Sequence, residues 1–481
     1  MLKFANCTLK LPTQIHFVEF IEKEIRNDIS FINTRHLNVT NSDEKIVLIN
    51  VNDLYGLAQT MKLPTENFNF IPESEYQKFD WSTIDTETDM GYILEVDLEY
   101  PKHLQSLHSD FPLAPALVHL NYSKFSPFCK SQYKNCSGDS KYNDNIVLNT
   151  LNSRLGYVVH FKNLKLYLNL GMKIQSILQV LRFTQKNFLK PFIEHCTLAR
   201  QNSATILEQD QFKKVANSAY GRTILNARNY LDIKLNTNET QLLKFVSDPT
   251  FKNYIILDEN LVQTNHFTPV ILHNKPIFVD FTISELSKHF MYDFYYNNLL
   301  KNAPCKIELG FADTDSFLFK VSKPDLFFEH IKPFLDFSNY PQSHPFHSIQ
   351  NKAKLGFFKD KLKGKLKCLE FIGLCTNCYA LKLKEDNAII EKKTCNGLGR
   401  ITKRNSLKFK HYKKRLFKSN SKKFDFHSIH SLKKLNISSI KAYKRSLSHF
   451  DFKRWIFNCG IHSVPYGSGI IKKEISVCPK C

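Results

Sequence analysis

The chain has 481 residues, of which 42% are hydrophobic and 23% are charged; this is ordinary for a globular protein of about two to four packed units and excludes a disordered chain. No apolar stretch is long enough to cross a bilayer, and residues 1–7 lack the apolar core of a secretory signal, so neither a membrane nor a compartment is indicated. The formal net charge of +22 favours a nucleic-acid partner, because Lys and Arg displace counterions from phosphates; from charge alone, a merely basic surface is an equal alternative.

The first half of the chain mixes helical and strand patterns. Residues 1–40 read as helix and loop, whereas residues 45–51 and 91–98 have the length and apolar content of buried strands. Between residues 109 and 144, the content of Pro, Ser, Lys and Cys predicts loops. From residue 164 to residue 198, apolar residues recur at spacings near three and four, which predicts a mainly helical region.

The second half begins with a further helical segment at residues 209–227. Strand patterns return after residue 231, with an apolar run at 254–257, and a helix is expected around residues 284–299. Two apolar runs then flank a polar centre between residues 307 and 321, which predicts a hairpin with acidic residues at its bend.

Asp313 and Asp315 stand at that bend. Because they are two residues apart, their carboxylates would project from the same face of an extended backbone, with Thr314 pointing the other way. Two adjacent negative charges are costly without a cation, so the pair indicates a site for a hard divalent ion. An exposed acidic turn is the alternative for such a pair taken alone.

The helix predicted at residues 209–227 carries a second constellation. Lys213, Asn217 and Tyr220 follow the spacing i, i+4 and i+7, so one helical face presents a cation, an amide and an aromatic ring. Such a face suits a nucleotide better than a protein core. An ordinary surface helix with a capped end is the alternative.

The excess of basic residues is concentrated in residues 403–454. This segment includes Lys410, Lys413, Lys414 and Arg415, which alternate with aromatic residues. The pattern suits contact with phosphates combined with stacking on bases.

Twelve cysteines do not make a disulfide scaffold in a chain of this length, so reduced thiols are expected. Two Cys-x-x-Cys pairs, Cys375 with Cys378 and Cys478 with Cys481, together supply the ligand count of a tetrahedral zinc site. They lie far apart in the chain, and most such pairs without nearby histidines or further cysteines are incidental. We therefore interpret both pairs as incidental.

Two motifs carry a resemblance to a known family. The pattern Lys-x-x-x-Asn-Ser-x-Tyr-Gly at residues 213–221 resembles motif B of the family B DNA polymerases, and Asp-Thr-Asp-Ser at residues 313–316 resembles their motif C. The resemblance is nearly continuous between the motifs and is to the protein-primed, organellar or viral type. It begins downstream of the place where the family keeps its proofreading exonuclease, so a truncated or an exonuclease-free chain is expected.

The resemblance implies a role for each residue of motif B. Lys213 meets the incoming triphosphate, Asn217 and Tyr220 lie beside the nascent base pair, and Gly221 lies at the DNA. Arg200, at the end of the preceding helical stretch, is expected as a second phosphate cation.

The resemblance implies two Mg²⁺ ions at motif C, for which Mn²⁺ can substitute. Asp315 is the main metal ligand and Asp313 supports it. One ion activates the primer hydroxyl, and the other holds the triphosphate and the departing pyrophosphate.

The sequence departs from the family at motif A. Residues 48–56 and 63–68 resemble this motif in polymerases of Polinton-like and adintovirus-like elements, where the position of Asn50 is aspartate. The resemblance implies that Val51 offers its carbonyl to the metal and that Tyr55 packs under the sugar and excludes ribonucleotides. Asn50 offers an oxygen but no charge, and Asp53 lies three positions along the chain, which does not put it in the same place.

A second departure concerns the grip on the primer end. The family carries Lys-x-Tyr here; Tyr379 keeps the tyrosine, whereas Asn377 stands at the lysine position. Cys375 occupies a position where relatives usually carry arginine, which is a further reason to interpret its Cys-x-x-Cys pair as drift.

The fold implied by the family is α/β (α+β): a right hand of palm, fingers and thumb with an antiparallel palm sheet. The expected partners are primer-template DNA, deoxynucleoside triphosphates and a terminal priming protein, and a nuclear or viral replication site is expected.

The expected units are an N-terminal remnant (1–44), palm with motif A (45–72), a terminal-protein-region-like insertion (73–158), fingers (159–230), a second insertion (231–285), palm with motif C (286–385) and a basic thumb and tail (386–481).

Motifs B and C favour a DNA-directed DNA polymerase. Asn50 and Asn377 favour the alternative, a catalytically decayed homologue that retains binding of DNA or of a protein. A reverse transcriptase is a third and weaker hypothesis. The palm of such enzymes also bears paired aspartates, but they lack the motif B pattern.

Overall fold

The computed structural model describes residues 2–481 with gaps at 13, 24, 27–28, 138–141, 224, 226–227, 229, 397, 399–405, 419–421, 432–436, 473–477 and 480. For residues 136–137, 422–431, 437–446 and 472, only the backbone is described. In the described part of the chain, no helix has both the length and the apolar character that a membrane span requires.

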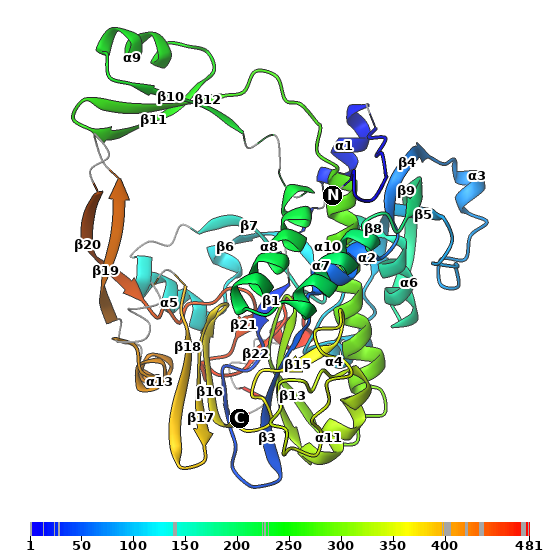
Figure 1. Ribbon diagram of the computed structural model, residues 1–481, viewed down its shortest axis with the longest axis vertical. Helices are drawn as coiled ribbons and strands as arrows, with labels where there is room; N and C mark the ends of the chain where they lie inside the picture. The colour runs from blue at the N-terminus through cyan, green and yellow to red at the C-terminus, as the bar shows by residue number, and fades with distance from the viewer. Residues whose placement is uncertain are drawn as a thin grey trace.

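The described residues form one large sheet and several small ones. The strands of the large sheet are β1 (Ser30–Ile32), β2 (His36–Asn38), β3 (Glu44–Val51), β13 (Ile307–Asp313), β14 (Ser316–Ser322), β15 (Phe358–Asp360), β16 (Lys367–Cys375), β17 (Cys378–Glu385) and β18 (Ala388–Thr394). Their order is β1-β13-β14-β3-β16-β17-β18, with β15 also on β3 and β2 also on β16, and every pair is antiparallel. This sheet lies in the lower half of Figure 1.

Strand β3 is buried on both faces, as its unbroken apolar run predicts. Val47 and Ile49 belong to one hydrophobic cluster, and Ile46 and Leu48 belong to another. The cluster of Val47 and Ile49 continues into three helices that cover this face. They are α10 (Ile277–Asp293), the π-helix η3 (Phe294–Leu300) and α11 (Pro324–Ile331).

The helix predicted at residues 284–299 is longer than expected. The helix begins at Ile277, because its first turns are packed in two hydrophobic clusters apart from that of the large sheet. Phe278 and Phe281 belong to one of these clusters, and Val279 and Ile283 belong to the other. The boundary expected at residue 285 therefore falls inside α10.

A second sheet of four antiparallel strands adjoins α10. Its order is β4 (Leu63–Phe70), β9 (Lys173–Lys186), β5 (Met90–Glu99) and β8 (Arg154–His160). The strand predicted at residues 91–98 is confirmed as β5. The mainly helical region predicted at 164–198 is wrong in its centre: α6 (Phe161–Asn169) and α7 (Lys190–Asn202) flank the long strand β9. From Leu181 to Gln185, buried residues of β9 alternate with half-buried ones. This period of two is hidden in the sequence by apolar spacings near three and four.

The loops predicted at residues 109–144 are also wrong. This segment forms β6 (Ala116–Asn121) and α5 (Pro127–Ser137), and β6 pairs with β7 (Asn143–Leu148). Their apolar residues form a small core with Ile456, which lies more than three hundred positions along the chain. Likewise, residues 1–40 contain the expected helix, α1 (Ile15–Glu22), but also β1 and β2.

Helices α7 and α8 (Ile206–Thr223) form an antiparallel pair that packs on α2 (Leu54–Thr60) in the centre of Figure 1. Beyond them, a separate unit projects at the upper left of the view, in the segment where the sequence predicts strands. It consists of β10 (Leu231–Asn236), α9 (Glu239–Val246), β11 (Phe251–Asp258) and β12 (Leu261–Phe267).

The C-terminal part of the described chain packs partly on β16 and β17 and partly against α5. Helix α13 (Phe409–Lys418) lies on these two strands. The other elements are α3 (Glu73–Tyr76), α4 (Leu104–Leu107), η1 (Tyr122–Lys124), η4 (Lys332–Phe334), β19 (Lys422–Ser431), β20 (Ile437–Ser446), β21 (Trp455–Ile456), β22 (Ser463–Val464) and α14 (Gly469–Lys472).

Candidate active site

The two acids of motif C lie at the tight turn between β13 and β14. Asp313 pairs with Ser316, so Thr314 and Asp315 form a two-residue turn. Thr314 has a left-handed backbone (φ 51°), and its N–H donates to the carbonyl oxygen of Ile29 at 2.8 Å. The hairpin with acids at its bend is confirmed. The argument that an extended backbone places both carboxylates on one face does not apply, because the backbone turns between them.

The end of β3 lies directly beside this turn. Ser316 pairs with Asn50, and the N–H of Val51 donates to the carbonyl oxygen of Asp315 at 2.8 Å. The side-chain amide of Asn50 donates to the same oxygen at 3.2 Å. The structure therefore brings together residues that the sequence assigns to motifs A and C.

Asp315 is half-buried, and its surroundings only partly compensate its charge. Burial raises the pKa of Asp315 above its ordinary value, and nearby Asp313 adds to the rise, whereas the amide of Asn50 and the charge of Lys361 oppose it. Carboxylates with amide and carbonyl oxygens beside them are the donors that Mg²⁺ prefers. The residues present thus fit a hard divalent ion, with one carboxylate fewer than the family pattern.

Lys361 is a charged neighbour that the sequence reasoning missed. It follows β15, and its N–H donates to the carbonyl oxygen of Leu48 at 2.8 Å. Burial lowers the pKa of Lys361, and Asp315 opposes this shift. No spacing in the sequence marks this lysine, because only the pairing of β15 with β3 brings it to the acids.

Asp53 does not replace the missing carboxylate of motif A. Its backbone is left-handed (φ 53°), and its side chain accepts the N–H of Gly56 at 3.2 Å as the N-cap of α2. The capping geometry holds this carboxylate at the end of the helix.

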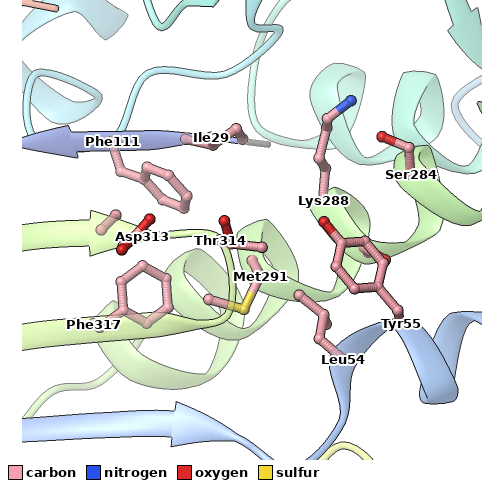
Figure 2. A pocket seen from close by; sticks show the side chains of 12 residues that line it. Ile29, Leu54, Tyr55, Phe111, Ser284, Lys288, Met291, Asp313, Thr314 and Phe317 are labelled. Atoms are coloured by element: carbon pink, nitrogen blue, oxygen red, sulfur yellow. The ribbon is translucent and has the colours of Figure 1, made fainter. Parts of the chain in front are cut away.

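Two tyrosines from separate helices meet near the turn. Tyr55 of α2 and Tyr220 of α8 are stacked, with ring centroids 4.5 Å apart and an interplanar angle of 19°. Figure 2 shows a pocket in which Tyr55 lies on one side and Asp313 and Thr314 lie on the other. The ring assigned to the sugar and the ring assigned to the base pair are therefore neighbours.

The predicted polar face of α8 is present and accessible. Lys213 and Asn217 are exposed, and Tyr220 is half-buried. The positive charge of Lys213 is among those that lower the pKa of Lys361, so this face of α8 lies within electrostatic range of the lysine beside Asp315. A methyl group added at Gly221 would meet no atom within 4 Å, so the chain itself does not require a glycine there. Arg200 is half-buried in the last turns of α7, and its role stays a prediction.

The primer-grip residues lie on the β16–β17 hairpin. Asn377 occupies its two-residue turn with a left-handed backbone (φ 57°), which asparagine tolerates better than lysine does. The ring of Tyr379 lies 5.0 Å from that of Phe311. Burial raises the pKa of Tyr379, and the charge of Asp313 adds to the rise, so this tyrosine lies within range of the motif C turn.

The basic helix α13 presents fewer free cations than the sequence predicts. Lys410 and Lys414 are exposed, whereas Lys413 forms an ion pair with Glu370 at 2.7 Å. The prediction that Arg415 contacts phosphate is wrong. Arg415 is buried on the helix face that packs on β16 and β17, and its Nε donates to the carbonyl oxygen of Leu447 at 2.8 Å.

No protein-family model and no curated protein matches the sequence. Among solved structures, the chain is similar to Phi29 DNA polymerase complexed with primer-template DNA, with 14% identity and a TM-score of 0.50. It is similar also to the ternary complex of that polymerase with incoming nucleotide substrates, with 14% identity and a TM-score of 0.52. Each match covers 92% of this chain and 64% of the other, so the chain spans less than two thirds of the structures it matches.

The likeness establishes the fold. The mixed α/β architecture with an antiparallel palm sheet, expected from the sequence, is confirmed. The large sheet is the antiparallel sheet of this fold and is called the palm below, whereas the assignment of residues 159–230 to the fingers stays a prediction.

Proposed function

We propose that the chain is a DNA-directed DNA polymerase of the protein-primed family B type, which adds deoxynucleotides to a primer end. One observation carries the proposal: the turn with Asp313 and Asp315 lies against the end of β3 and opposite the stacked Tyr55 and Tyr220. Motifs A, B and C come from separate parts of the chain, and they meet at one place.

In this proposal, Asp313 and Asp315 hold the Mg²⁺ ions, and the oxygens of Val51 and Asn50 assist. When bound, the ions activate the primer hydroxyl and neutralise the triphosphate and the leaving pyrophosphate. Every other part of the site binds or orients the substrates.

The substrates are deoxynucleoside triphosphates and primer-template DNA. Lys213 and Arg200 bind the triphosphate, Asn217 and Tyr220 contact the nascent base pair, and Tyr55 excludes a ribose hydroxyl. The primer-template is held by Tyr379, Asn377, Gly221, Lys410, Lys413 and Lys414. A terminal priming protein, an origin in a Polinton-like or adintovirus-like element and replication in the nucleus or a viral factory belong to the same proposal.

A second candidate is a catalytically decayed homologue that binds primer-template DNA without extending it. The position of Asn50 favours it, because a neutral amide that donates to Asp315 stands where the two-metal mechanism expects a bridging carboxylate.

Primer extension separates the two candidates. Purified protein is incubated with primer-template, deoxynucleotides and Mg²⁺ or Mn²⁺, with Asp315→Asn as the control. Extension by the natural chain that is absent in Asp315→Asn supports a polymerase. DNA binding without extension under both metals would support the decayed homologue, and neither binding nor extension would contradict both.

A further inference from the structure

Four potential metal ligands converge near the C-terminal end of the chain, away from the motifs of the polymerase site. They are Cys459, His462, Cys478 and Cys481, and their ligand atoms all lie within 4.8 Å of one another. In the described part of the chain, no other group of three or more His, Cys, Asp or Glu meets this condition. The sequence interpretation of Cys478 and Cys481 as incidental does not account for this convergence.

The three sulfur atoms surround a single ring nitrogen. The Nδ1 atom of His462 lies 3.7 Å from Sγ of Cys459, 3.3 Å from Sγ of Cys478 and 3.4 Å from Sγ of Cys481. A neutral ring nitrogen either donates one hydrogen or accepts with one lone pair, so hydrogen bonding does not account for three thiols around it. A shared metal ion does.

The distances match a tetrahedral zinc ion. With Zn–S of about 2.3 Å and Zn–N of about 2.0–2.1 Å, the sulfur–nitrogen edge of a regular tetrahedron is about 3.6 Å. All three observed distances lie within about 0.3 Å of this value. Three thiolates and one imidazole are a common ligand set of structural zinc sites, and four protein ligands leave no open position for catalysis.

The backbone presents the ligands from two tight turns. Cys459 and His462 flank the turn of the β21–β22 hairpin, where the N–H of His462 points to Sγ of Cys459 at 3.5 Å. Gly460 enables this turn, because its φ is +70° and a side chain there would also meet the ring of Phe128 at 2.9 Å. In the second turn, the N–H of Cys481 donates to the carbonyl oxygen of Cys478 at 3.3 Å.

The β21–β22 hairpin is attached to the palm. The N–H of Arg35 donates to the carbonyl oxygen of Ile461 at 2.9 Å, and its guanidinium donates to that of Gly460 at 3.0 Å. The neighbouring Asn33 donates its N–H to the carbonyl oxygen of Gly310 on β13, at 2.8 Å. Strand β13 ends at Asp313, so the metal ligands are connected through β13 to the motif C turn.

We propose that Cys459, His462, Cys478 and Cys481 bind one structural zinc ion that fastens the C-terminal end of the chain to the palm. The other Cys-x-x-Cys pair is not part of the site. Cys375 and Cys378 pair with each other across the β16–β17 turn and belong to a different hydrophobic cluster.

The first experiment measures zinc in protein produced with zinc in the medium and purified in a reducing buffer. We expect about one zinc ion per chain by elemental mass spectrometry, a clear loss of it in Cys478→Ser and Cys481→Ser, and no loss in Cys375→Ser. The last variant is a matched control from the other Cys-x-x-Cys pair. A chain without stoichiometric zinc, or with iron in its place, would overturn the proposal, as would a variant pattern in which Cys375→Ser also loses the ion.

A second measurement uses the natural chain and so does not depend on whether the variants fold. X-ray absorption at the zinc edge should show three sulfur ligands and one nitrogen ligand; four sulfurs would overturn the proposed set. Alkylation followed by peptide mass spectrometry should show Cys459, Cys478 and Cys481 protected until a strong chelator is added, with Cys375 unchanged. Cys481 is exposed, so its rapid alkylation before chelation would contradict a bound ion.

Discussion

The side-chain amide of Asn50 donates a hydrogen bond of 3.2 Å to the backbone carbonyl of Asp315, which joins the end of β3 to the turn that carries the acids. An ionised carboxylate at position 50 could not make this bond, because it has no hydrogen to donate. It would also add negative charge beside Asp315, whose pKa burial already raises. Asn50 therefore suits the metal-free protein better than the aspartate of the family pattern.

The first prediction is that Asn50→Asp exchanges stability for activity. Without metal, we expect the variant to lose about 1–3 kcal/mol of unfolding free energy, because a hydrogen bond is replaced by charge repulsion. With Mg²⁺, we expect primer extension to rise about a hundredfold, which corresponds to roughly 3 kcal/mol of transition-state stabilisation. Thermal unfolding with and without Mg²⁺ or Mn²⁺, and single-turnover extension, measure both effects.

Asp53→Asn is the control, because asparagine also caps helices and accepts a left-handed backbone, so both activity and stability should stay near those of the natural chain. A large loss of activity in this control would indicate that Asp53 serves the metal after all. Asn377→Lys belongs in the same series, since a loose primer end could hide the gain from Asn50→Asp. Equal extension by the natural chain and Asn50→Asp would contradict the assignment of motif A.

The second prediction concerns the exposed face of α8. Lys213→Ala should weaken nucleotide binding about tenfold or more, because it removes a charge-assisted contact with the triphosphate. Stability should change by less than about 1 kcal/mol, as for most surface substitutions. Lys214→Ala is a matched control, since Lys214 is equally exposed but points about 100° away around the helix. Titration with nucleotide in the presence of primer-template measures the nucleotide affinity of the two variants. Similar losses of affinity in Lys213→Ala and Lys214→Ala would refute a specific role for Lys213.

Local patterns were sufficient to predict the parts of the site that are close in sequence. The acidic turn at Asp313 and Asp315, the buried strand that ends at Asn50 and Val51, and the polar face of α8 each follow from spacing within one element. Spacing did not predict that these three parts lie close together. That expectation came from the resemblance to a family. In the structure, the pairing of β3 with β14 places the ends of β3 and β13 together.

The parts that the sequence did not predict depend on contacts between distant segments. Lys361 reaches the acids only because β15 pairs with β3, and Arg415 is buried only because α13 turns that face towards β16 and β17. Cys459 and His462 form a Cys-x-x-His spacing that carries little information by itself. Folding places it beside Cys478 and Cys481, and no local pattern encodes that encounter.

The third prediction revises the basic surface expected to hold DNA. The double variant Lys410→Gln with Lys414→Gln should bind primer-template with a weaker salt dependence. The negative slope of log K against log salt should become shallower by roughly one to two, because each phosphate contact contributes about 0.9. The affinity should fall similarly for different DNA sequences, since phosphates carry no base information. Fluorescence anisotropy at several ionic strengths provides the slope.

The control pair is Lys301→Gln with Lys323→Gln, which removes two exposed charges outside the basic helix, one after η3 and one directly after β14. This pair should leave the slope unchanged. Equal changes in both double variants would indicate a general charge effect and would remove α13 from the DNA contact. Arg415→Ala, in contrast, should destabilise the fold, because it leaves the carbonyl oxygen of Leu447 without this donor.

The fourth prediction is that Gly221→Ala harms binding of DNA but not folding. An added methyl group meets open space, and alanine is a better helix former than glycine by up to about 1 kcal/mol, so thermal stability should stay equal or rise. If the primer-template approaches this part of α8 closely, its affinity should fall several-fold. Ser218→Ala, one turn earlier on α8, controls for helix propensity. Unchanged affinity in Gly221→Ala would place the DNA elsewhere.

The fifth prediction follows from His449, which is buried next to Arg415 and Arg35. Burial lowers the pKa of His449 to about 3, and the two positive charges lower it further than burial alone. The unfolded chain binds a proton on this histidine near pH 6.5, whereas the folded chain does not bind one until about pH 3. The stability that the neutral ring contributes is therefore complete above about pH 6.5 and is lost progressively as the pH falls towards 3, with a slope of at most about 1.4 kcal/mol per pH unit.

His449→Leu should remove this dependence, because leucine fills a similar volume and takes up no proton. Chemical denaturation at pH 7.5, 6.5, 5.5 and 4.5 would measure the unfolding free energy of both proteins. The expected result is a shallower decline for His449→Leu below about pH 6.5, whatever its stability at neutral pH, because one of the protons taken up on unfolding is gone. Parallel curves for the two proteins would mean that His449 takes up its proton at the same pH in the folded and the unfolded chain, and its burial beside two arginines would then need another compensating charge.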